Sequence, residues 1–286
     1  MSGVAGPVTA VQALGYRGDH HLPLPEMVAT EEPLEIRVAG PHQVAVPAVV
    51  TMRTPGRDFE LAAGFLVTEG LCARDEISAV RYCDQADAEH RFNVVTVSIR
   101  RAWDPGSTRR DFMATAACGV CGKATIDAVE LACPVVAGSA PVAASLITLL
   151  PDRLRAGQRA FNTTGGLHAA GLFDPDGTLV CLREDVGRHN AVDKVIGHTV
   201  LEHTVLEHTA SHSPMAGSDI LMVSGRVSFE IVQKAAMAGI GILAAVSAPS
   251  SLAVAAAERL GVAVAGFVRD GRYNVYSHPE RLAFDR

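Results

Sequence analysis

Two cysteines at positions 118 and 121 are the residues of this chain best suited to chemistry. A glycine follows each of them, and Lys123 comes next. Cysteines at this spacing can direct both sulfurs to one point. A nearby cation or a helix N-terminus favours the thiolate, which is the form that attacks electrophiles and binds metal. The pair Cys118 and Cys121 therefore indicates sulfur transfer, disulfide exchange or zinc binding, and the spacing alone leaves all three open.

The rest of the sequence bears on these alternatives. A structural zinc site needs four ligands, and the sequence holds no second Cys-x-x-Cys motif, although Cys133, Cys181 or a histidine could complete a set. A thioredoxin-like site would place the pair at a strand–helix junction, whereas an irregular segment precedes it here. Sulfur carriage needs an exposed thiol on a mobile segment and a docking pocket for the acceptor, and we favour this interpretation.

Composition limits the class of protein. Of the 286 residues 48% are hydrophobic and 20% are charged, which suffices for a core without a disulfide scaffold. The net charge of −6 argues against a broad nucleic-acid interface. No secretory signal is recognisable, so we expect a cytoplasmic protein. Pro249 interrupts the apolar stretch 235–257, and each half is too short to cross a membrane.

The order of the predicted elements divides the chain into four parts. Residues 1–27 are rich in Gly, Pro and His and predict a flexible tail. Residues 28–111 combine a strand hairpin, a helix over 58–68 and a further strand, which is typical of a small α+β domain. Residues 112–123 predict a mobile loop that carries the cysteines. Residues 124–286 alternate strands with helices, which predicts an α/β domain with a mostly parallel sheet and flanking helices, because parallel strands need crossovers.

Three strand-to-helix junctions in this α/β domain are candidate ligand sites. They are residues 183–190 with Arg188, residues 224–228 with Arg226, and residues 247–251. Ligands collect at the carboxyl ends of the strands in such sheets, and free N–H groups at helix starts bind anions. Helix capping explains any single junction equally well. Three junctions on one sheet edge favour a pocket for phosphate or another anion.

A fourth candidate is the segment 266–272, in which a strand ends in the tight turn Asp270-Gly271. Arg269 and Arg272 flank this turn. The two guanidinium groups could clamp a phosphate or stack on a base, or they could simply lie exposed at a hairpin tip. The sequence leaves these two interpretations equally open.

Several longer segments resemble the FdhD family of sulfur-carrier accessory proteins of formate dehydrogenase. The matching segments are CGVCG at 118–122, FNTTGGLHAAGLF at 161–173, REDVGRHNAVDKVIG at 183–197, SGRVSFEIVQKAAMAGI at 224–240, VSAPSSLAV at 246–254 and GFVRDGRYNVYSHPERL at 266–282. They occur in order between Pro33 and Leu282. The resemblance is therefore much more specific than a bare Cys-x-x-Cys motif.

This resemblance implies a cytoplasmic homodimer that accepts sulfur from a cysteine desulfurase. It implies delivery of that sulfur to the molybdenum cofactor, Mo-bis(molybdopterin guanine dinucleotide), which is bound as a substrate before its insertion into formate dehydrogenase. The persulfide-bearing cysteine of the family matches Cys118, with Cys121 as its partner. We expect Arg188 and Arg226 to help hold the phosphates. A nucleotide-contacting hexapeptide of the family matches Phe267, Val268, Arg269, Asp270, Gly271 and Arg272.

The larger domain of the family resembles the cytidine deaminase fold, which offers a check on the chemistry. Zinc deaminases carry His-x-Glu at one helix start and Pro-Cys-x-x-Cys at the next. The corresponding positions here are 188–191 and 224–228, and they hold neither the glutamate nor the cysteines. We therefore expect no deaminase activity. The rival to sulfur carriage is a zinc-stabilised binding module in which the cysteine pair is structural.

Overall fold

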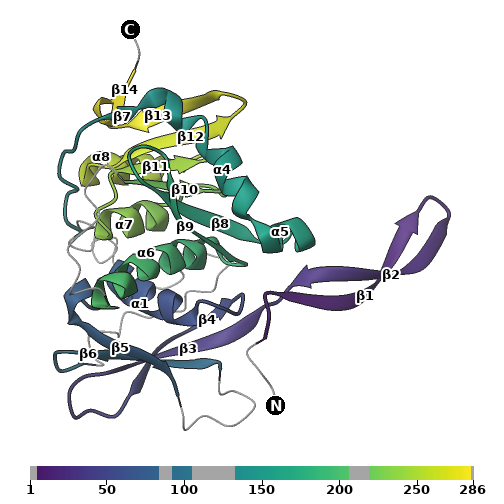
Figure 1. The fold of residues 1–286 in the computed structure, drawn as a ribbon, viewed down its shortest axis with the longest axis horizontal. Helices are drawn as coiled ribbons and strands as arrows, with labels where there is room; N and C mark the ends of the chain where they lie inside the picture. The colour runs from purple at the N-terminus through teal and green to yellow at the C-terminus, as the bar shows by residue number, and fades with distance from the viewer. Residues whose placement is uncertain (1–4, 84–91, 105–132, 206–218, 285–286) are drawn as a thin grey trace.

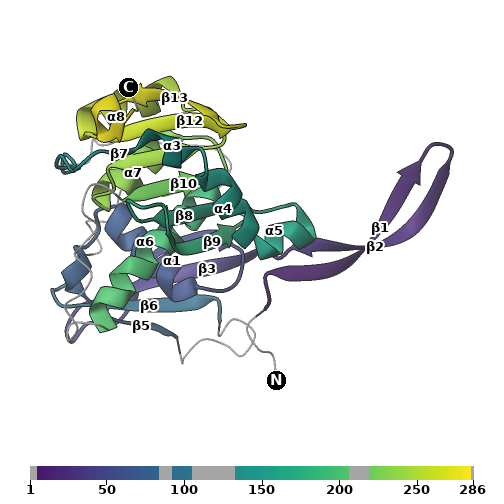
Figure 2. The same ribbon diagram turned by 45° about the horizontal axis from the view of Figure 1, so that its top comes forward.

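The chain forms two stacked α/β parts and a long hairpin arm that projects from them (Figures 1 and 2). Both the cysteine pair and the predicted loop 112–123 lie outside the residues that the structure describes. The computed structural model describes residues 5–83, 92–104, 133–205 and 219–284.

The smaller part is a four-stranded sheet with strand order β4-β3-β6-β5. The predicted hairpin is present as β3 (Glu32–Ala39) and β4 (Val46–Arg53). Strand β3 also pairs in parallel with β6 (Val94–Ile99), which pairs antiparallel with β5 (Ile77–Tyr82). Helix α1 (Asp58–Thr68) occupies the predicted residues and packs on β5 and β6. The buried residues Leu34, Ile36 and Val38 alternate along β3 and join α1 in one core.

The larger part is a six-stranded sheet with strand order β13-β12-β11-β10-β8-β9. Its strands are β8 (His168–Phe173), β9 (Leu179–Asp185), β10 (Ile220–Val223), β11 (Ile242–Ala245), β12 (Ala263–Arg269) and β13 (Arg272–Ser277). Only β10–β11 and β11–β12 pair in parallel, whereas β8–β9, β8–β10 and β12–β13 are antiparallel.

The prediction of a mostly parallel sheet was therefore wrong. The turns 174–178 and 270–271 join β8 to β9 and β12 to β13, and turns this short allow only antiparallel pairing. The α/β alternation that suggested crossovers holds for the strands from β9 to β12, but β8 lies between β9 and β10 and pairs antiparallel with both. The resemblance to a cytidine deaminase fold stays a prediction.

Helices cover both faces of the larger sheet. Helices α6 (Arg188–Val205), α7 (Phe229–Met237) and α8 (Ser251–Leu260) contribute to one core, and α4 (Leu150–Gly157) lies on the other face. Successive residues of β10 point to opposite faces of the sheet, as in any strand. Leu221 and Val223 pack in the core with α6, α7 and α8, and Ile220 and Met222 pack in the core with α4. The short elements are α3 (Ala144–Ile147), α5 (Arg159–Thr164), β7 (Val142–Ala143), β14 (Leu282–Ala283), η1 (Arg74–Glu76) and η3 (Pro279–Arg281).

The two parts meet where α1 crosses α6 between the sheets (Figure 1). Gly64 of α1 and Gly197 of α6 lie at the crossing point. A Cβ atom on Gly64 would overlap the carbonyl oxygen of Asp193, and one on Gly197 would overlap that of Glu60. Glycine therefore allows the two backbones to touch, and the core of the smaller part is continuous with that of the larger.

The arm corrects the prediction of a flexible tail over residues 1–27. Strands β1 (Val8–Arg17) and β2 (His20–Ala29) pair along their full length and extend away from the body (Figures 1 and 2). The turn between them begins at Gly18, whose φ of 64° a glycine adopts without strain. The glycines and prolines of this segment suggested disorder although its apolar residues suit a strand. In the described part of the chain, no helix has the length and apolarity needed to span a membrane.

Candidate functional site

The carboxyl ends of four strands lie at one edge of the larger sheet. Strands β9 and β10 both run antiparallel to β8, so they point the same way, and β11 and β12 follow β10 in parallel. Helices α6, α7 and α8 begin where β9, β10 and β11 end, and the β12–β13 turn leaves the same edge. We call this edge the rim and define it as residues 186–190, 224–228, 246–250 and 267–272.

Backbone hydrogen bonds join the loops of the rim into one surface. Val227 pairs with Pro249 in an isolated bridge. The Val227 N–H donates to the Ala248 carbonyl at 3.1 Å, and the Ser250 N–H donates to the Val227 carbonyl at 3.0 Å. The Phe267 N–H donates to the Ser247 carbonyl at 3.2 Å. The junctions predicted separately from the sequence therefore lie side by side.

The start of α7 differs from the start of α8. Ser250 caps α8, because its side chain accepts a hydrogen bond from the Ala253 N–H at 3.2 Å. Ser228 occupies the N-cap position of α7 but makes no such bond. Its hydroxyl instead donates to Glu230 Oε2 at 3.1 Å and lies 3.2 Å from His189 Nε2. The first N–H groups of α7 thus lack a side-chain cap and add positive potential to the rim.

A histidine–glutamate pair bridges the first turns of α6 and α7. His189 Nε2 lies 2.9 Å from Glu230 Oε2. The hydrogen bond from His189 lowers the pKa of Glu230 to about 2, so this carboxylate is charged at neutral pH. The sequence analysis missed this pair because the two residues belong to separate helices. Their only signal was that each stands near the start of a predicted helix.

Arg188 and His168 lie beside this bridge. Arg188 is the first residue of α6, and its Nε is buried without a hydrogen-bond partner among the described residues. His168 begins β8 at the same edge. Burial lowers the pKa of His168, and its electrostatic interactions with Arg188 and His189 lower it further. A buried guanidinium N–H without an acceptor is a costly group that an anion would satisfy.

The predicted hexapeptide forms the β12–β13 hairpin at the end of the rim. Asp270 and Gly271 have φ values of 53° and 70°, as the tight turn of a two-residue hairpin requires. Phe267 has a φ of 55° at an irregularity in the strand pairing, a backbone conformation that costs free energy in a non-glycine residue. The Arg269 guanidinium carbon lies 5.7 Å from the centre of the Phe267 ring.

The predicted ligand residues differ in how far they are exposed. Arg226, Arg269 and Arg272 are exposed, and Arg188 is partly buried. Val268 is completely buried in the core beneath the hairpin, so its side chain holds the hairpin on the sheet and does not face a ligand.

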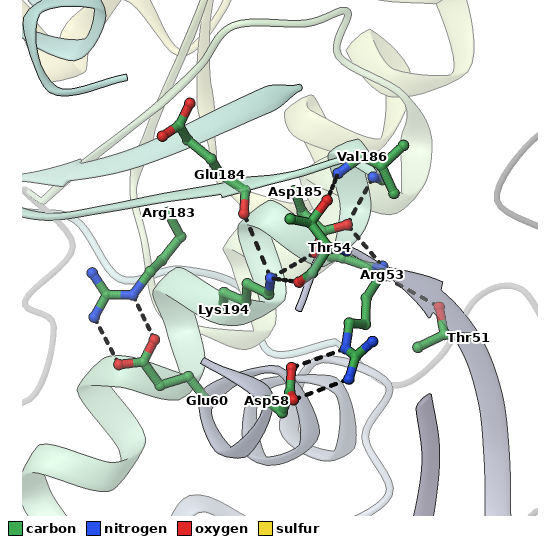
Figure 3. Close-up of polar contacts among 12 residues, drawn as sticks. Thr51, Arg53, Thr54, Asp58, Glu60, Arg183, Glu184, Asp185, Val186 and Lys194 are labelled. Atoms are coloured by element: carbon green, nitrogen blue, oxygen red, sulfur yellow. Dashed lines mark hydrogen bonds and ion pairs between the residues drawn. The ribbon is translucent and has the colours of Figure 1, made fainter. Parts of the chain in front are cut away.

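A buried polar cluster supports the rim from the smaller part (Figure 3). Asp185 ends β9, and its carboxylate accepts hydrogen bonds from the N–H groups of Thr54 at 3.1 Å and Gly187 at 2.8 Å. It also accepts one from the Asn190 side chain at 3.2 Å. The start of α6, and with it Arg188, is thereby fixed to the loop between β4 and α1. The sequence analysis did not foresee this cluster.

No group of three or more metal-ligating His, Cys, Asp or Glu side chains occurs among the described residues. Four cysteines lie in this part of the chain and none is in a disulfide: Cys72, Cys83, Cys133 and Cys181. Burial raises the pKa of the Cys181 thiol to about 12 and that of Cys133 to about 11. These two thiols are therefore unreactive at neutral pH.

The fold and the rim define a mixed α/β protein with a cationic, helix-lined edge suited to anionic ligands. The chain belongs to the FdhD/NarQ family, whose model matches residues 29–283. It is 46% identical to the "Sulfur carrier protein FdhD" of Mycolicibacterium paratuberculosis over 265 residues, which cover 90% of this chain and 92% of that protein. It is 48% identical to the protein of the same name from Streptomyces coelicolor, with 91% and 90% covered.

A solved structure supports the same assignment. A crystal structure described as a formate dehydrogenase accessory protein from Desulfotalea psychrophila superposes with a TM-score of 0.71 at 25% identity. The alignment covers 96% of this chain and 99% of that one. The predicted family is thus confirmed by both sequence and structure.

Proposed function

We propose that this chain is a cytoplasmic sulfur carrier that serves formate dehydrogenase. It accepts sulfur from a cysteine desulfurase as a persulfide on Cys118. It passes the sulfur to Mo-bis(molybdopterin guanine dinucleotide), its substrate, before that cofactor enters formate dehydrogenase. We infer further that the chain acts as a homodimer.

The observation that carries this proposal is the convergence of three helix N-termini and an arginine-flanked hairpin at one rim. A guanine dinucleotide carries a diphosphate and a flat base. Helix N-termini and arginines suit the phosphates, and a Phe267–Arg269 pair suits stacking on the base. The buried Arg188 Nε, which has no hydrogen-bond partner in the described part of the chain, supports an anion at this place. The names of the relatives support sulfur as the cargo.

The proposed sulfur transfer begins at the persulfide of the desulfurase. The Cys118 thiolate attacks the outer sulfur of the desulfurase persulfide, which forms Cys118–S–SH and releases the desulfurase thiolate. The carried sulfur must gain two electrons to become sulfide. Cys121 supplies them if its thiolate attacks the inner sulfur of Cys118, because this forms the Cys118–Cys121 disulfide and expels HS⁻. Exchange of HS⁻ for an oxygen ligand of molybdenum would take up one proton and release water, and a dithiol reductant would reduce the Cys118–Cys121 disulfide. In the alternative, Cys121 shares the persulfide.

The rim is tested by guanine-nucleotide binding to the full chain. Arg272→Ala removes one exposed cation from the hairpin and is expected to weaken GDP binding by about 10- to 100-fold, the effect of one charge-assisted hydrogen bond. Arg81→Ala removes another exposed cation, in β5, and serves as the matched control. Isothermal titration calorimetry measures the affinity of both variants for GDP. Equal affinities would show that the hairpin does not contribute to the nucleotide site.

The zinc-stabilised binding module makes a different prediction. It requires about one tightly bound zinc per chain and loss of structure on chelation. Elemental analysis of the purified chain distinguishes the zinc module from the sulfur carrier, since a sulfur carrier folds and binds GDP without metal.

A further inference from the structure

The contacts of His189 and Glu230 determine which nitrogen of the histidine ring carries a fixed proton. His189 Nε2 lies 2.9 Å from Glu230 Oε2 and 3.2 Å from the Ser228 hydroxyl. That hydroxyl donates its own hydrogen to Glu230 at 3.1 Å. Both neighbours therefore present an oxygen acceptor to Nε2, so Nε2 carries a proton and donates it. We call His189 and Glu230 the dyad.

The other ring nitrogen, Nδ1, is left open to a ligand. In the described part of the chain it has no hydrogen-bond partner, and the His189 side chain is 26% exposed. Because Nε2 keeps its proton, the ring gains and loses a proton at Nδ1. A carboxylate that holds one ring nitrogen while the other is free is the arrangement that histidine uses in general acid–base catalysis.

The charges around the dyad favour the protonated ring. Glu230 is charged at neutral pH, and its negative charge stabilises an imidazolium beside it. His168 has a lowered pKa, so it is neutral and does not repel that imidazolium. The charged side chains that act on the dyad, directly or through His168, are Arg188 of α6, Asp185 of β9 and Lys234 of α7. Lys234 is itself neutralised by ion pairs with Asp193 and Glu69.

The proposed sulfur transfer needs a proton donor at the rim, since the exchange of HS⁻ for an oxygen ligand takes up one proton. Within the rim as defined above, His189 is the single histidine. The arginines of the rim stay protonated and cannot release a proton near neutral pH. Histidine is the side chain whose charge ordinarily changes in this range. His189 is therefore the side chain of the rim best suited to donate the proton.

The dyad also lies where the metal end of the proposed substrate extends. Strand β13 is the edge of the sheet, so from the hairpin the rim continues only toward α8, α7 and α6. Strands β12, β11 and β10 are successive neighbours, which puts the start of α7 roughly 10 Å along the rim from the hairpin. The proposed function places the guanine base at the hairpin, and a sugar and a diphosphate separate that base from the metal. The metal end therefore extends toward the dyad.

We propose that His189 is the proton donor of the sulfur-transfer step and that Glu230 is the residue that positions it. This inference rests on the proposed function. Nδ1–H of His189 gives its proton to the departing oxygen ligand, and HS⁻ gives the second, so the oxygen leaves as water. Sulfide takes its place without a change in the oxidation state of the metal. The neutral imidazole then regains a proton from solvent.

The test separates proton donation from a merely structural contact between two helices. His189→Gln keeps a side-chain donor for Glu230 and removes the nitrogen that titrates, and Glu230→Gln keeps the shape and removes the charge. His278→Gln is the matched control, because His278 Nδ1 also pairs with a carboxylate, that of Glu280 at 2.7 Å, and its side chain is 21% exposed. It follows Ser277, which pairs near the start of β12, at the end of the strand away from the rim.

Each full-length chain is loaded with radiolabelled sulfur at Cys118 and mixed with Mo-bis(molybdopterin guanine dinucleotide). The rate at which label reaches the cofactor is measured in a single turnover over a range of pH. His189→Gln should load sulfur and bind GDP as the parent chain does but transfer about 100-fold more slowly, the usual contribution of a general acid. The parent rate should fall at high pH as Nδ1 loses its proton. This fall should begin at lower pH in Glu230→Gln and be absent in His189→Gln.

The outcomes distinguish the dyad from the proposed function. A His189→Gln chain that transfers sulfur at the parent rate, or that keeps the fall at high pH, would overturn the role of His189 and leave the sulfur carrier intact. A parent chain that loads or transfers no sulfur would overturn both. Nitrogen NMR of the parent chain checks the dyad without substrate, because the neutral ring should carry its proton on Nε2. A neutral His189 protonated on Nδ1 would overturn the assignment.

Discussion

Lys194 Nζ lies 2.7 Å from Asp185 Oδ2 in the interior, where both side chains are almost completely buried. Lys194 also donates to the Thr54 carbonyl at 2.8 Å, and Asp185 accepts from the Thr54 N–H. Asp185 ends β9 and Lys194 lies in α6, and because both bond to Thr54, which follows β4, the pair joins the smaller part of the molecule to the rim (Figure 3). The geometry of the rim therefore depends on a buried polar cluster behind it.

Removing Lys194 should destabilise the whole protein. Lys194→Met leaves the Asp185 carboxylate buried without its cation, which costs about 3–5 kcal/mol in comparable pairs. The double variant Asp185→Asn/Lys194→Met removes both charges and should lose less than the sum of the single losses. Denaturant unfolding measures these free energies. Arg81→Met, an exposed substitution, is the control, and a Lys194→Met loss as small as that control would contradict the role of the pair.

The crossing of α1 and α6 predicts a second sensitive position. Gly64→Ala adds a methyl group that would overlap the Asp193 carbonyl oxygen. The helices must separate, which should cost about 1–3 kcal/mol or more and outweigh the gain in helix propensity. Gly138→Ala is the matched control, because a Cβ there meets nothing within 4 Å. Equal unfolding midpoints for the two variants would show that the crossing is not tightly packed.

Glu60 should make stability depend on pH in the acid range. Burial raises the pKa of this carboxyl, but hydrogen bonds from Arg183 and His198 outweigh it and lower the pKa from 4.5 to about 2. A carboxyl group whose pKa is lowered by folding stabilises the fold at pH values above its ordinary pKa. This stabilisation is lost as the pH falls toward 2.

The corresponding variant is Glu60→Gln. It should be less stable than the parent chain at pH 7 by up to about 3 kcal/mol, and the difference should shrink between pH 4.5 and pH 2. Glu31→Gln changes an exposed carboxylate and should show no such trend. Thermal unfolding across this range is the measurement, and a difference that grows toward low pH would contradict the assigned contacts.

The sequence predicted elements in both parts where the signal is local. Helix α1 of the smaller part and the 270–271 turn of the larger part are examples, since helical spacing of apolar residues and an Asp-Gly pair specify them without tertiary information. The sheet pairing was mispredicted because the direction of β8 relative to β10 depends on packing of the whole sheet. Strand β5 was missed because much of it is exposed and Arg81 interrupts its apolar pattern.

The candidate site was predictable only in part. Arg188, Arg226 and the 267–272 hairpin were found because they stand at junctions where strands end. The His189–Glu230 bridge and the Asp185–Lys194 pair were not, because their partners lie far apart in the sequence or on different helices. Strand order determines which junctions share an edge of the sheet, and local sequence patterns do not specify strand order.

The most direct test of the central claim is the mass of the intact chain after incubation with a cysteine desulfurase and cysteine. The account predicts a gain of about one sulfur atom, removable by a thiol reductant and located on Cys118 by peptide mapping. Cys118→Ala should abolish this gain and retain GDP binding, and Cys133→Ala is the matched cysteine control. An unmodified Cys118 in a chain that binds GDP, or a gain that persists in Cys118→Ala, would contradict the account.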